Sequence, residues 1–240
     1  MQRRTLRFLA IVCIGLGLGL TARAAEIIIV GDSLTCGPFG QRLLADLSIS
    51  NHVTIFCAVS SRPIHWLKGT SPGWPCETLV TGDKAFHACL KSGKFPTLDS
   101  ILKGRKNVEV IVALGTNSLS SPTPEPSYQT MALDIINHGL SCRWIGPPHL
   151  RPDQALGKTQ AQKDKNAAEL TLEDNHLVSF YPGLSTLVAT SCHLADSRSW
   201  TAKGSPGGET DDGTHREGTA KAVASGYYWA DNIIQELGLL

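Results

Sequence analysis

The chain has 240 residues, and its 22 lysines and arginines nearly balance its 21 aspartates and glutamates, so the formal net charge at pH 7 is +1. This balance leaves no basic patch to indicate a nucleic-acid partner. Apolar residues make up 42% and charged residues 18% of the chain, which is ordinary for a globular protein that can bury a sizeable core.

The first 24 residues have the features of a secretory signal peptide. Three arginines precede an apolar run at residues 8–20, and residues 22–24 read Ala-Arg-Ala, the small-x-small pattern of a cleavage site. The run is shorter than the roughly 20 residues that a membrane-spanning helix needs. We therefore predict a signal peptide at 1–24, one mature domain at 25–240 without a stable membrane anchor, and a periplasmic or secreted location.

Six cysteines follow this segment, and an even number in an exported chain favours disulfides. Six cysteines allow 15 pairings, among which sequence cannot choose. The pairs that we favour are Cys36–Cys57, Cys76–Cys89 and Cys142–Cys192. No two cysteines have C-x-x-C spacing and no histidines have H-E-x-x-H spacing, so we predict no metal and no cofactor.

Uninterrupted apolar runs predict buried strands, and helical spacing of apolar residues predicts the elements between them. The predicted strands are Ile27–Val30, Val53–Val59, Val108–Leu114, Ser141–Ile145 and Leu177–Tyr181. The predicted helices are Phe39–Leu47, Met131–His138, Ala155–Leu172 and a last helix from Thr219 onward. This alternation indicates an α/β fold, a three-layer sandwich around a central, mostly parallel five-stranded sheet.

Two glycine- and proline-rich stretches, 64–87 and 189–211, are expected to be irregular, the first as an insertion at the rim of the site. The last helix is expected to pack across the sheet through one apolar side. That side comprises Ala220, Val223, Ala224, Tyr227, Ala230, Ile234 and Leu237.

Ser33 is the candidate nucleophile, because it lies just past the carboxyl end of the first predicted strand, where open α/β folds keep their ligand crevice. A serine hydroxyl needs a base to accept its proton and an acid to orient that base. Asp212 and His215 offer both, since a separation of three residues on a turn lets the carboxylate reach Nδ1 of the imidazole. Asp211 is adjacent, but the spacing favours Asp212. Ser71 also fits a nucleophile pattern, G-x-S-x-G, but no strand precedes it.

The GDSL motif at residues 31–34 resembles the block that opens the GDSL, or SGNH, hydrolase family of esterases and lipases. Asp212-x-x-His215 ahead of a C-terminal helix is similar to the family's last block. The resemblance implies a flavodoxin-like SGNH fold and acyl transfer to Ser33, with His215 as base and Asp212 as its orienting acid.

The resemblance also implies an oxyanion hole, a set of donors aimed at the negative oxygen of the tetrahedral intermediate. Its donors would be the backbone N–H of Ser33, the backbone N–H of Ser61 and the side-chain amide of Asn117 after the third predicted strand. The family has a glycine where this chain has Ser61. Backbone donation survives a change of side chain, but whether Ser60 or Ser61 donates is left open.

Arg62 and Trp66 follow the second oxyanion position and are candidate substrate-binding residues, because arginine can grip a carboxylate and an indole face can stack on a sugar. The alternative is that Trp66 is a core or loop-packing residue, as tryptophans more often are, and that Arg62 is a surface charge. We expect an exported serine hydrolase that removes a short acyl group, such as acetyl, from a carbohydrate or peptidoglycan. The alternatives are a lipase, lysophospholipase or thioesterase of the same family, and a non-catalytic ligand-binding protein that retains the fold. Oligomeric state is not predicted.

Overall fold

A computed structural model describes residues 26–90 and 94–239 of the chain. The predicted signal peptide and its cleavage site lie outside these residues. Within them, no helix combines the length and the apolar character needed to cross a membrane.

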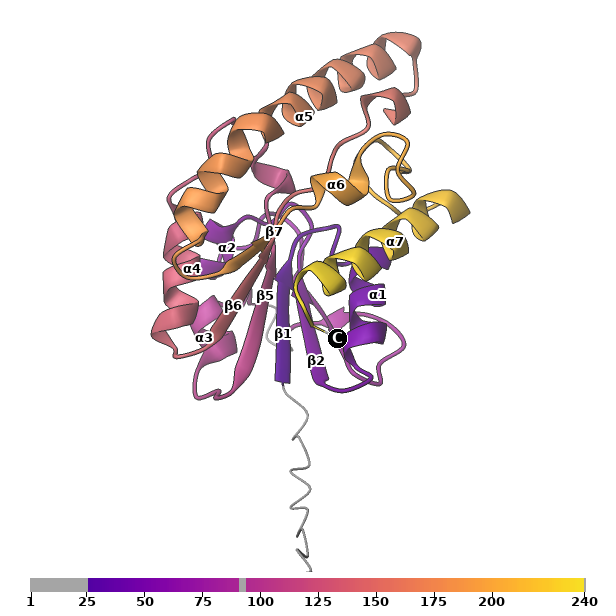
Figure 1. The fold of residues 1–240 in the computed structure, drawn as a ribbon. Helices are drawn as coiled ribbons and strands as arrows, with labels where there is room; N and C mark the ends of the chain where they lie inside the picture. Colours follow the sequence, from indigo (N-terminus) through magenta and orange to yellow (C-terminus); the bar gives the residue numbers. More distant parts are fainter. Residues whose placement is uncertain (1–25, 91–93, 240) are drawn as a thin grey trace, which may run out of the picture.

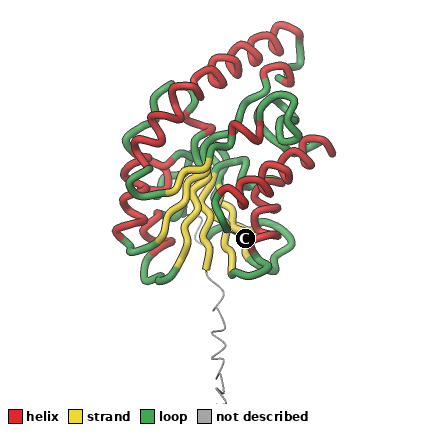
Figure 2. The backbone as a smooth tube through the Cα atoms, in the orientation of Figure 1, coloured by secondary structure: helices red, strands yellow, loops and turns green. Residues whose placement is uncertain are grey.

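A seven-stranded sheet forms the centre of the fold (Figure 2). Its strands are β1 (Glu26–Gly31), β2 (His52–Cys57), β3 (Glu77–Val80), β4 (His87–Ala88), β5 (Val108–Ala113), β6 (Ser141–Ile145) and β7 (His193–Ala195). They lie in the order β4-β3-β2-β1-β5-β6-β7, and every pairing from β2 to β7 is parallel. This parallel part has the flavodoxin-like strand order, with its switch point between β1 and β5.

Helices cover both faces of the sheet (Figure 1). They are α1 (Pro38–Leu47), α2 (Pro63–Lys68), α3 (Leu98–Leu102), α4 (Ser127–Asn137), α5 (Gln160–Val188), α6 (Arg198–Thr201) and α7 (Ala220–Glu236). Helices α2 to α5 pack against one face and α1 and α7 against the other, so the core divides into two clusters with the sheet between them. The predicted three-layer α/β sandwich is confirmed.

The prediction of five strands is wrong, because β3 and β4 add an antiparallel pair at one edge of the sheet. They lie in the stretch that we expected to be irregular. Strand β3 has four residues and β4 has two, so neither gives a long apolar run. The disulfide Cys76–Cys89 joins the two strands at one end.

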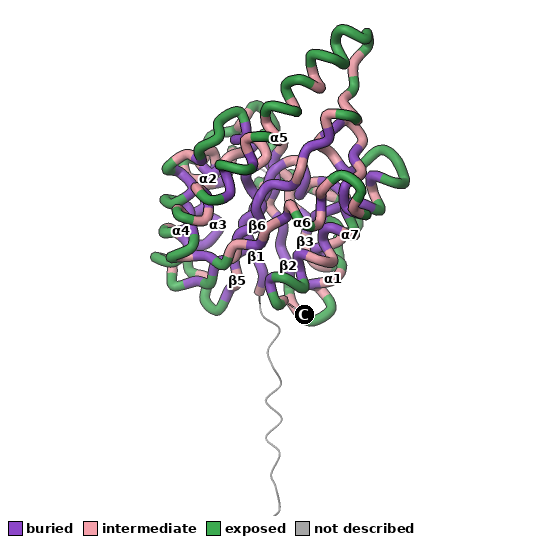
Figure 3. The backbone as a smooth tube through the Cα atoms, turned by 45° about the horizontal axis from the view of Figure 1, so that its top comes forward, coloured by how far each residue is buried: buried purple, intermediate pink, exposed green. Residues whose placement is uncertain are grey.

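The predicted strand Leu177–Tyr181 is wrong as well, because these residues belong to helix α5. The buried residues of this half of α5 recur at helical spacing, and they are Leu177, Phe180, Tyr181, Leu184 and Val188. The fifth parallel strand is instead β7, inside the stretch that we expected to be a loop. The first half of α5 projects from the body and is mostly exposed (Figure 3).

Helix α7 does pack on the sheet, but through a face rotated from the predicted one. Ala220, Ala224 and Tyr227 are exposed. The buried side chains are those of Ala222, Ser225, Trp229, Ala230, Ile233 and Ile234. Trp229, which was not part of the predicted face, stacks on Phe39 of α1 at 3.7 Å between ring centroids.

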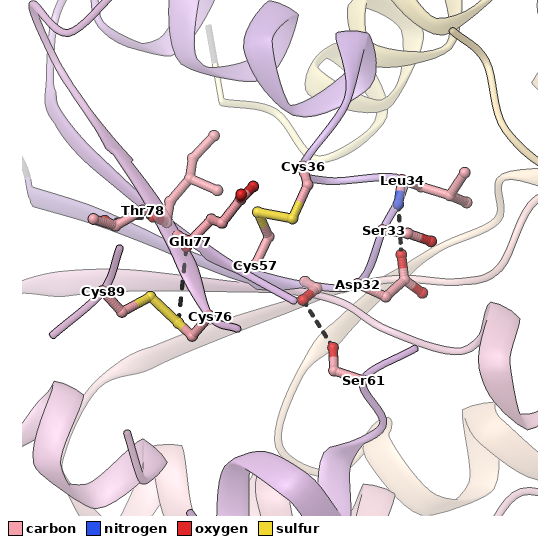
Figure 4. Close-up of a disulfide and its surroundings, with 12 residues drawn as sticks. Asp32, Ser33, Leu34, Cys36, Cys57, Ser61, Cys76, Glu77, Thr78 and Cys89 are labelled. Carbon is pink, nitrogen blue, oxygen red and sulfur yellow. Dashed lines mark hydrogen bonds between the residues drawn. A yellow bond between two sulfur atoms is a disulfide. The ribbon is translucent and has the colours of Figure 1, made fainter. Parts of the chain in front are cut away.

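The three favoured disulfides all form in the structure. Cys36–Cys57 joins the turn after β1 to the end of β2 (Figure 4). Cys142–Cys192 joins β6 to the segment before β7. Closed loops of this kind stabilise a fold by restricting the unfolded chain.

The register of the sheet brings three strand ends to one level. Gly31, the last residue of β1, pairs with Cys57 of β2 on one side and with Ala113 of β5 on the other. The chain segments that follow these three residues therefore leave the same edge of the sheet next to one another. These segments contain Ser33, Ser61 and Asn117.

Candidate active site

The turn that carries Ser33 is built by close packing and one buried acid. Gly31 must be glycine, since an added Cβ would lie 2.0 Å from Oγ1 of Thr35. Oδ1 of Asp32 accepts the backbone N–H of Leu34 at 3.1 Å, and the Asp32 carbonyl accepts the N–H of Thr35. The N–H of Ser33 has no acceptor among the described residues and is free to bind a ligand.

Ser33, His215 and Asp212 form a continuous hydrogen-bonded chain. Nε2 of His215 lies 3.1 Å from Oγ of Ser33, and Nδ1 lies 2.7 Å from Oδ2 of Asp212. Oδ1 of Asp212 also accepts the backbone N–H groups of Thr214 and His215. The carboxylate therefore holds both the ring and the backbone of the same histidine. This is the arrangement in which an imidazole can take a proton from a serine hydroxyl.

Asp211 does not compete for the imidazole. Its carboxylate lies against Gly218, where an added Cβ would meet Oδ2 at 2.4 Å. Its backbone N–H donates to the His215 carbonyl at 2.7 Å. Asp211 thus closes the loop, and Asp212 faces the ring.

The hydrogen bond between Asp212 and His215 shifts the pKa of both groups toward their charged forms. The hydrogen bond to Asp212 raises the pKa of His215 above 6.5, although partial burial acts in the opposite direction. Burial alone would raise the pKa of Asp212, but the hydrogen bonds from the side chain and backbone of His215 outweigh it and hold that pKa below 3.8. An imidazole of raised basicity is a stronger proton acceptor.

Arg216 was not among the predicted site residues, but it anchors the loop that carries His215. Its guanidinium is buried and donates to the carbonyls of Gly207, Thr214 and His149 at 3.0 to 3.2 Å. It also lies 5.1 Å from the ring centre of Trp229. Burial lowers the pKa of Arg216 to about 9. The one feature of the sequence that could have indicated this role is the position of Arg216 directly after His215.

Asp32 is a second residue whose role was not predicted. It is 2% exposed, and burial raises its pKa to about 7, against the hydrogen bond from Leu34 and the charge of His215. A group that titrates near neutrality one residue from a nucleophile is an electrostatic element of the site. Its presence in the GDSL motif was visible, but its burial was not.

The two further oxyanion candidates lie together. Nδ2 of Asn117 donates to the Ser61 carbonyl at 3.2 Å, and the Ser61 hydroxyl donates to the Gly31 carbonyl. The Ser61 N–H donates to the Ala58 carbonyl at 3.2 Å and so is engaged inside its own turn. Ser60, with φ of 61°, forms the left-handed corner of that turn. Among the described residues, the N–H groups of Ser33 and Ser60 have no acceptor, so these two and the second amide hydrogen of Asn117 are the donors left for a ligand.

The predicted substrate-binding role of Trp66 is wrong, because its side chain is 0% exposed and belongs to the core beside Phe95. A residue of α2 that fills the core has no indole face to offer a sugar. Arg62 is about one-third exposed, but its Nη1 lies 2.5 Å from Oε1 of Glu125. This ion pair engages Nη1 of the guanidinium that we expected to grip a substrate carboxylate, and the binding role of Arg62 stays a prediction.

One group of three potential metal-binding side chains occurs in the described part of the chain, namely Cys36, Cys57 and Glu77 (Figure 4). The two cysteine sulfurs are joined in a disulfide. A disulfide sulfur is not the thiolate that binds metals, so this group does not fit a metal ion.

No protein-family model matches the chain, and no curated protein matches it. The solved structures that are similar to it include the following three. A DUF4886 family protein from Bacteroides uniformis is 12% identical with a TM-score of 0.51, over 88% of this chain and 83% of that one. An extracellular lipase from Streptomyces rimosus is 12% identical with a TM-score of 0.45, over 89% of this chain and 100% of that one. A GDSL-like lipase from Bacteroides thetaiotaomicron is 13% identical with a TM-score of 0.42, over 88% of each chain. The first likeness shows a shared fold, and the other two superpose too loosely to add to it.

Proposed function

We propose that the protein is an exported, single-domain serine hydrolase of the GDSL/SGNH type that cleaves a carboxylic ester. The observation that carries this proposal is the chain of two hydrogen bonds from Ser33 through His215 to Asp212. The three residues lie at the carboxyl edge of a parallel sheet, at its switch point, where α/β folds bind ligands.

The geometry supports a two-step acyl transfer. Oγ of Ser33 attacks the ester carbonyl while its proton passes to Nε2 of His215, and the Ser33 N–H and Asn117 amide bind the oxyanion. His215 then gives this proton to the leaving oxygen while the ester C–O bond breaks, so that the alcohol departs and the acyl group stays on Ser33. A water molecule, deprotonated by His215, hydrolyses the acyl-enzyme and restores the serine.

A small cavity at the nucleophile favours a short acyl group such as acetyl. It has a volume of only about 10 Å³, and its lining includes Ser33, His215, Glu217 and several apolar side chains. Pockets for drug-sized ligands typically measure about 300–1,000 Å³. A long fatty acyl chain would not fit inside, which weighs against a lipase. The three disulfides support export, because such bonds persist in oxidising compartments. We propose an acylated carbohydrate or peptidoglycan as the substrate class.

The test combines turnover with covalent labelling. Wild-type protein should hydrolyse p-nitrophenyl acetate and be labelled by a fluorophosphonate at Ser33, and Ser33→Ala should lose both. Ser71→Ala is the matched control, since the Ser71 hydroxyl donates to the Trp74 carbonyl and accepts the Gly73 N–H, both within its own loop. A wild-type protein that is neither active nor labelled would instead be a binding protein. Release of acetate from acetylated glycans and from peptidoglycan, against fatty-acyl esters, then tests the substrate class.

A further inference from the structure

The hydroxyl of Thr35, two residues after the nucleophile, is buried and has no hydrogen-bond partner among the described residues. Its Oγ1 lies against the end of β1, where a Cβ added at Gly31 would be only 2.0 Å away. The group therefore lies inside the turn that carries Ser33, out of reach of bulk solvent. Buried hydroxyls in folded proteins are almost always paired, either with protein groups or with ordered water.

A cavity with room for one water molecule lies beside Thr35. Its volume is about 10 Å³, which is close to the smallest space that holds a water. Asp32 and Thr116 line the same cavity, so three polar side chains meet there, and a buried water needs about two to four such partners. The other lining side chains are mostly apolar and include Leu34, Phe39, Ile145 and Trp229.

Asp32 needs a partner that can both donate and accept a hydrogen bond. Its side chain is 2% exposed, and its Oδ1 accepts the N–H of Leu34 at 3.1 Å. Burial raises the pKa of Asp32 to about 7, so the protonated and the ionised forms are both populated near neutral pH. The ionised form only accepts, whereas the protonated form must also donate. A water molecule can donate to the first and accept from the second.

We propose that this cavity binds one water molecule, which links the Thr35 hydroxyl to the Asp32 carboxyl. Ser33 and His215 do not line the cavity, so this water is a fixed part of the turn and not the water that attacks the acyl-enzyme. Thr35 is a positioning residue, because through the water it orients the carboxyl whose Oδ1 holds the N–H of Leu34, directly after the nucleophile. The water site does not depend on the proposed function, whereas its effect on turnover rests on it.

The sign of a stability change tests the water site. Thr35→Val removes the hydroxyl and keeps the shape of the side chain. With the water bound, the urea midpoint of the full protein should fall, because the water and Asp32 each lose a partner. Were the hydroxyl simply unpaired, the same variant would remove a buried polar group without a partner, and its midpoint would rise.

Ser225→Ala is the matched control for this measurement. The Ser225 hydroxyl is equally buried and also has no partner among the described residues, but it does not line this cavity. Its midpoint should stay near or above that of wild type. An equal fall for Thr35→Val and Ser225→Ala would overturn the water site.

Kinetics test the positioning role. Thr35→Val should lower kcat for p-nitrophenyl acetate about tenfold per fluorophosphonate-labelled Ser33, with KM little changed, because small displacements of a reacting group are costly. Thr35→Ser keeps the hydroxyl and loses the methyl group, so it should keep kcat near wild type. A packing role alone would affect the serine variant as much as the valine variant, and that result would overturn the positioning role.

Crystal structures of both proteins locate the water directly. Wild type should show one water about 2.5–3.0 Å from Oγ1 of Thr35 and from a carboxyl oxygen of Asp32, and Thr35→Val should lack it. A wild-type structure without this water, or a raised midpoint for Thr35→Val, would overturn the site. A protein without turnover or label would overturn the proposed function, while the crystal structures and midpoints would still decide for or against the water.

Discussion

Nε2 of His215 lies 3.1 Å from Oγ of Ser33, although 182 residues separate the two along the chain. Ser33 is held by the end of β1, whereas His215 belongs to a loop that Arg216 and Asp211 fasten in place. The contact therefore depends on two separately anchored segments. Loss of either anchor should lower activity before it unfolds the sheet.

Replacing Asp212 with asparagine should lower kcat by roughly 10³–10⁴-fold with little change in KM, because the ring loses the acceptor that fixes its tautomer. The same change removes the main cause of the raised pKa of His215, so the acid limb of the kcat/KM profile should move to lower pH. Steady-state kinetics across pH measure both effects.

Asp211→Asn is the control for this prediction, since the Asp211 carboxylate faces Gly218 and not the imidazole. It should keep kcat within a few-fold of wild type. Equal losses for the two variants would mean that the choice of Asp212 as the orienting acid is mistaken.

Local patterns were sufficient for the centre of the fold and for the pairing of His215 with Asp212. Strands β1, β2, β5 and β6 are short and mostly apolar, which is typical of strands buried in a parallel sheet. The two members of the acid–base pair are close in sequence, so a turn alone could bring them together. What the pattern could not supply was the tertiary contact with Ser33.

The failures arise where neighbours distant in sequence decide the outcome. Leu177–Tyr181 is a short, mostly apolar run. In a run of this length, periodicity alone does not distinguish a strand from part of a buried helix. Trp66 follows an oxyanion segment and was therefore a candidate for substrate binding, but it is buried and packs against Phe95. The raised pKa of Asp32 likewise depends on burial, which no local motif reports.

Asp32→Asn should change how stability depends on pH. Burial raises the pKa of Asp32 from 3.8 to about 7, so between these values the folded protein holds a proton that the unfolded chain has released. The free energy of unfolding therefore falls as pH rises from about 4 to about 7 and stays lower above it. The variant lacks this decline. The free energy of unfolding of the variant minus that of wild type should therefore be larger at pH 8 than at pH 4, by up to roughly 4 kcal/mol.

Urea denaturation of both proteins at pH 4, 6 and 8 measures this difference. Asp164→Asn, on the exposed part of α5, is the control. Its free energy of unfolding should depend on pH in the same way as that of wild type. If the Asp32→Asn and wild-type curves stayed parallel, Asp32 would be ionised in the fold throughout this range.

Asn117→Ala should lower kcat by roughly 10²–10³-fold, because one oxyanion donor is lost and the Ser61 N–H is engaged with Ala58. Asn117→Asp should be worse, since a carboxylate brings negative charge to the developing oxyanion. KM for a small ester should change little in both. Kinetics with p-nitrophenyl acetate, normalised to labelled Ser33, measure the loss, and an alanine variant with near-wild-type kcat would assign the donor elsewhere.

Removing the disulfide Cys36–Cys57 should impair activity as well as stability, whereas removing Cys142–Cys192 should impair stability alone. The two bonds close loops with sequence separations of 21 and 50, for which loop-closure entropy predicts contributions of about 3 and 4 kcal/mol. Cys36 lies in the turn that carries Ser33, and Cys57 ends the strand that leads to Ser61 (Figure 4). The bond therefore fixes the nucleophile relative to the neighbouring strand end.

Double alanine variants of each pair, assayed well below their melting temperatures, separate the two effects. The Cys36–Cys57 variant should lose about tenfold or more in kcat per labelled serine, since a displacement of about 1 Å at a reacting group can cost up to 10²-fold. The Cys142–Cys192 variant should keep kcat per labelled serine near wild type, despite the larger loss of stability. Equal kcat values for the two variants would show that the backbone and Asp32 hold the Ser33 turn without the disulfide.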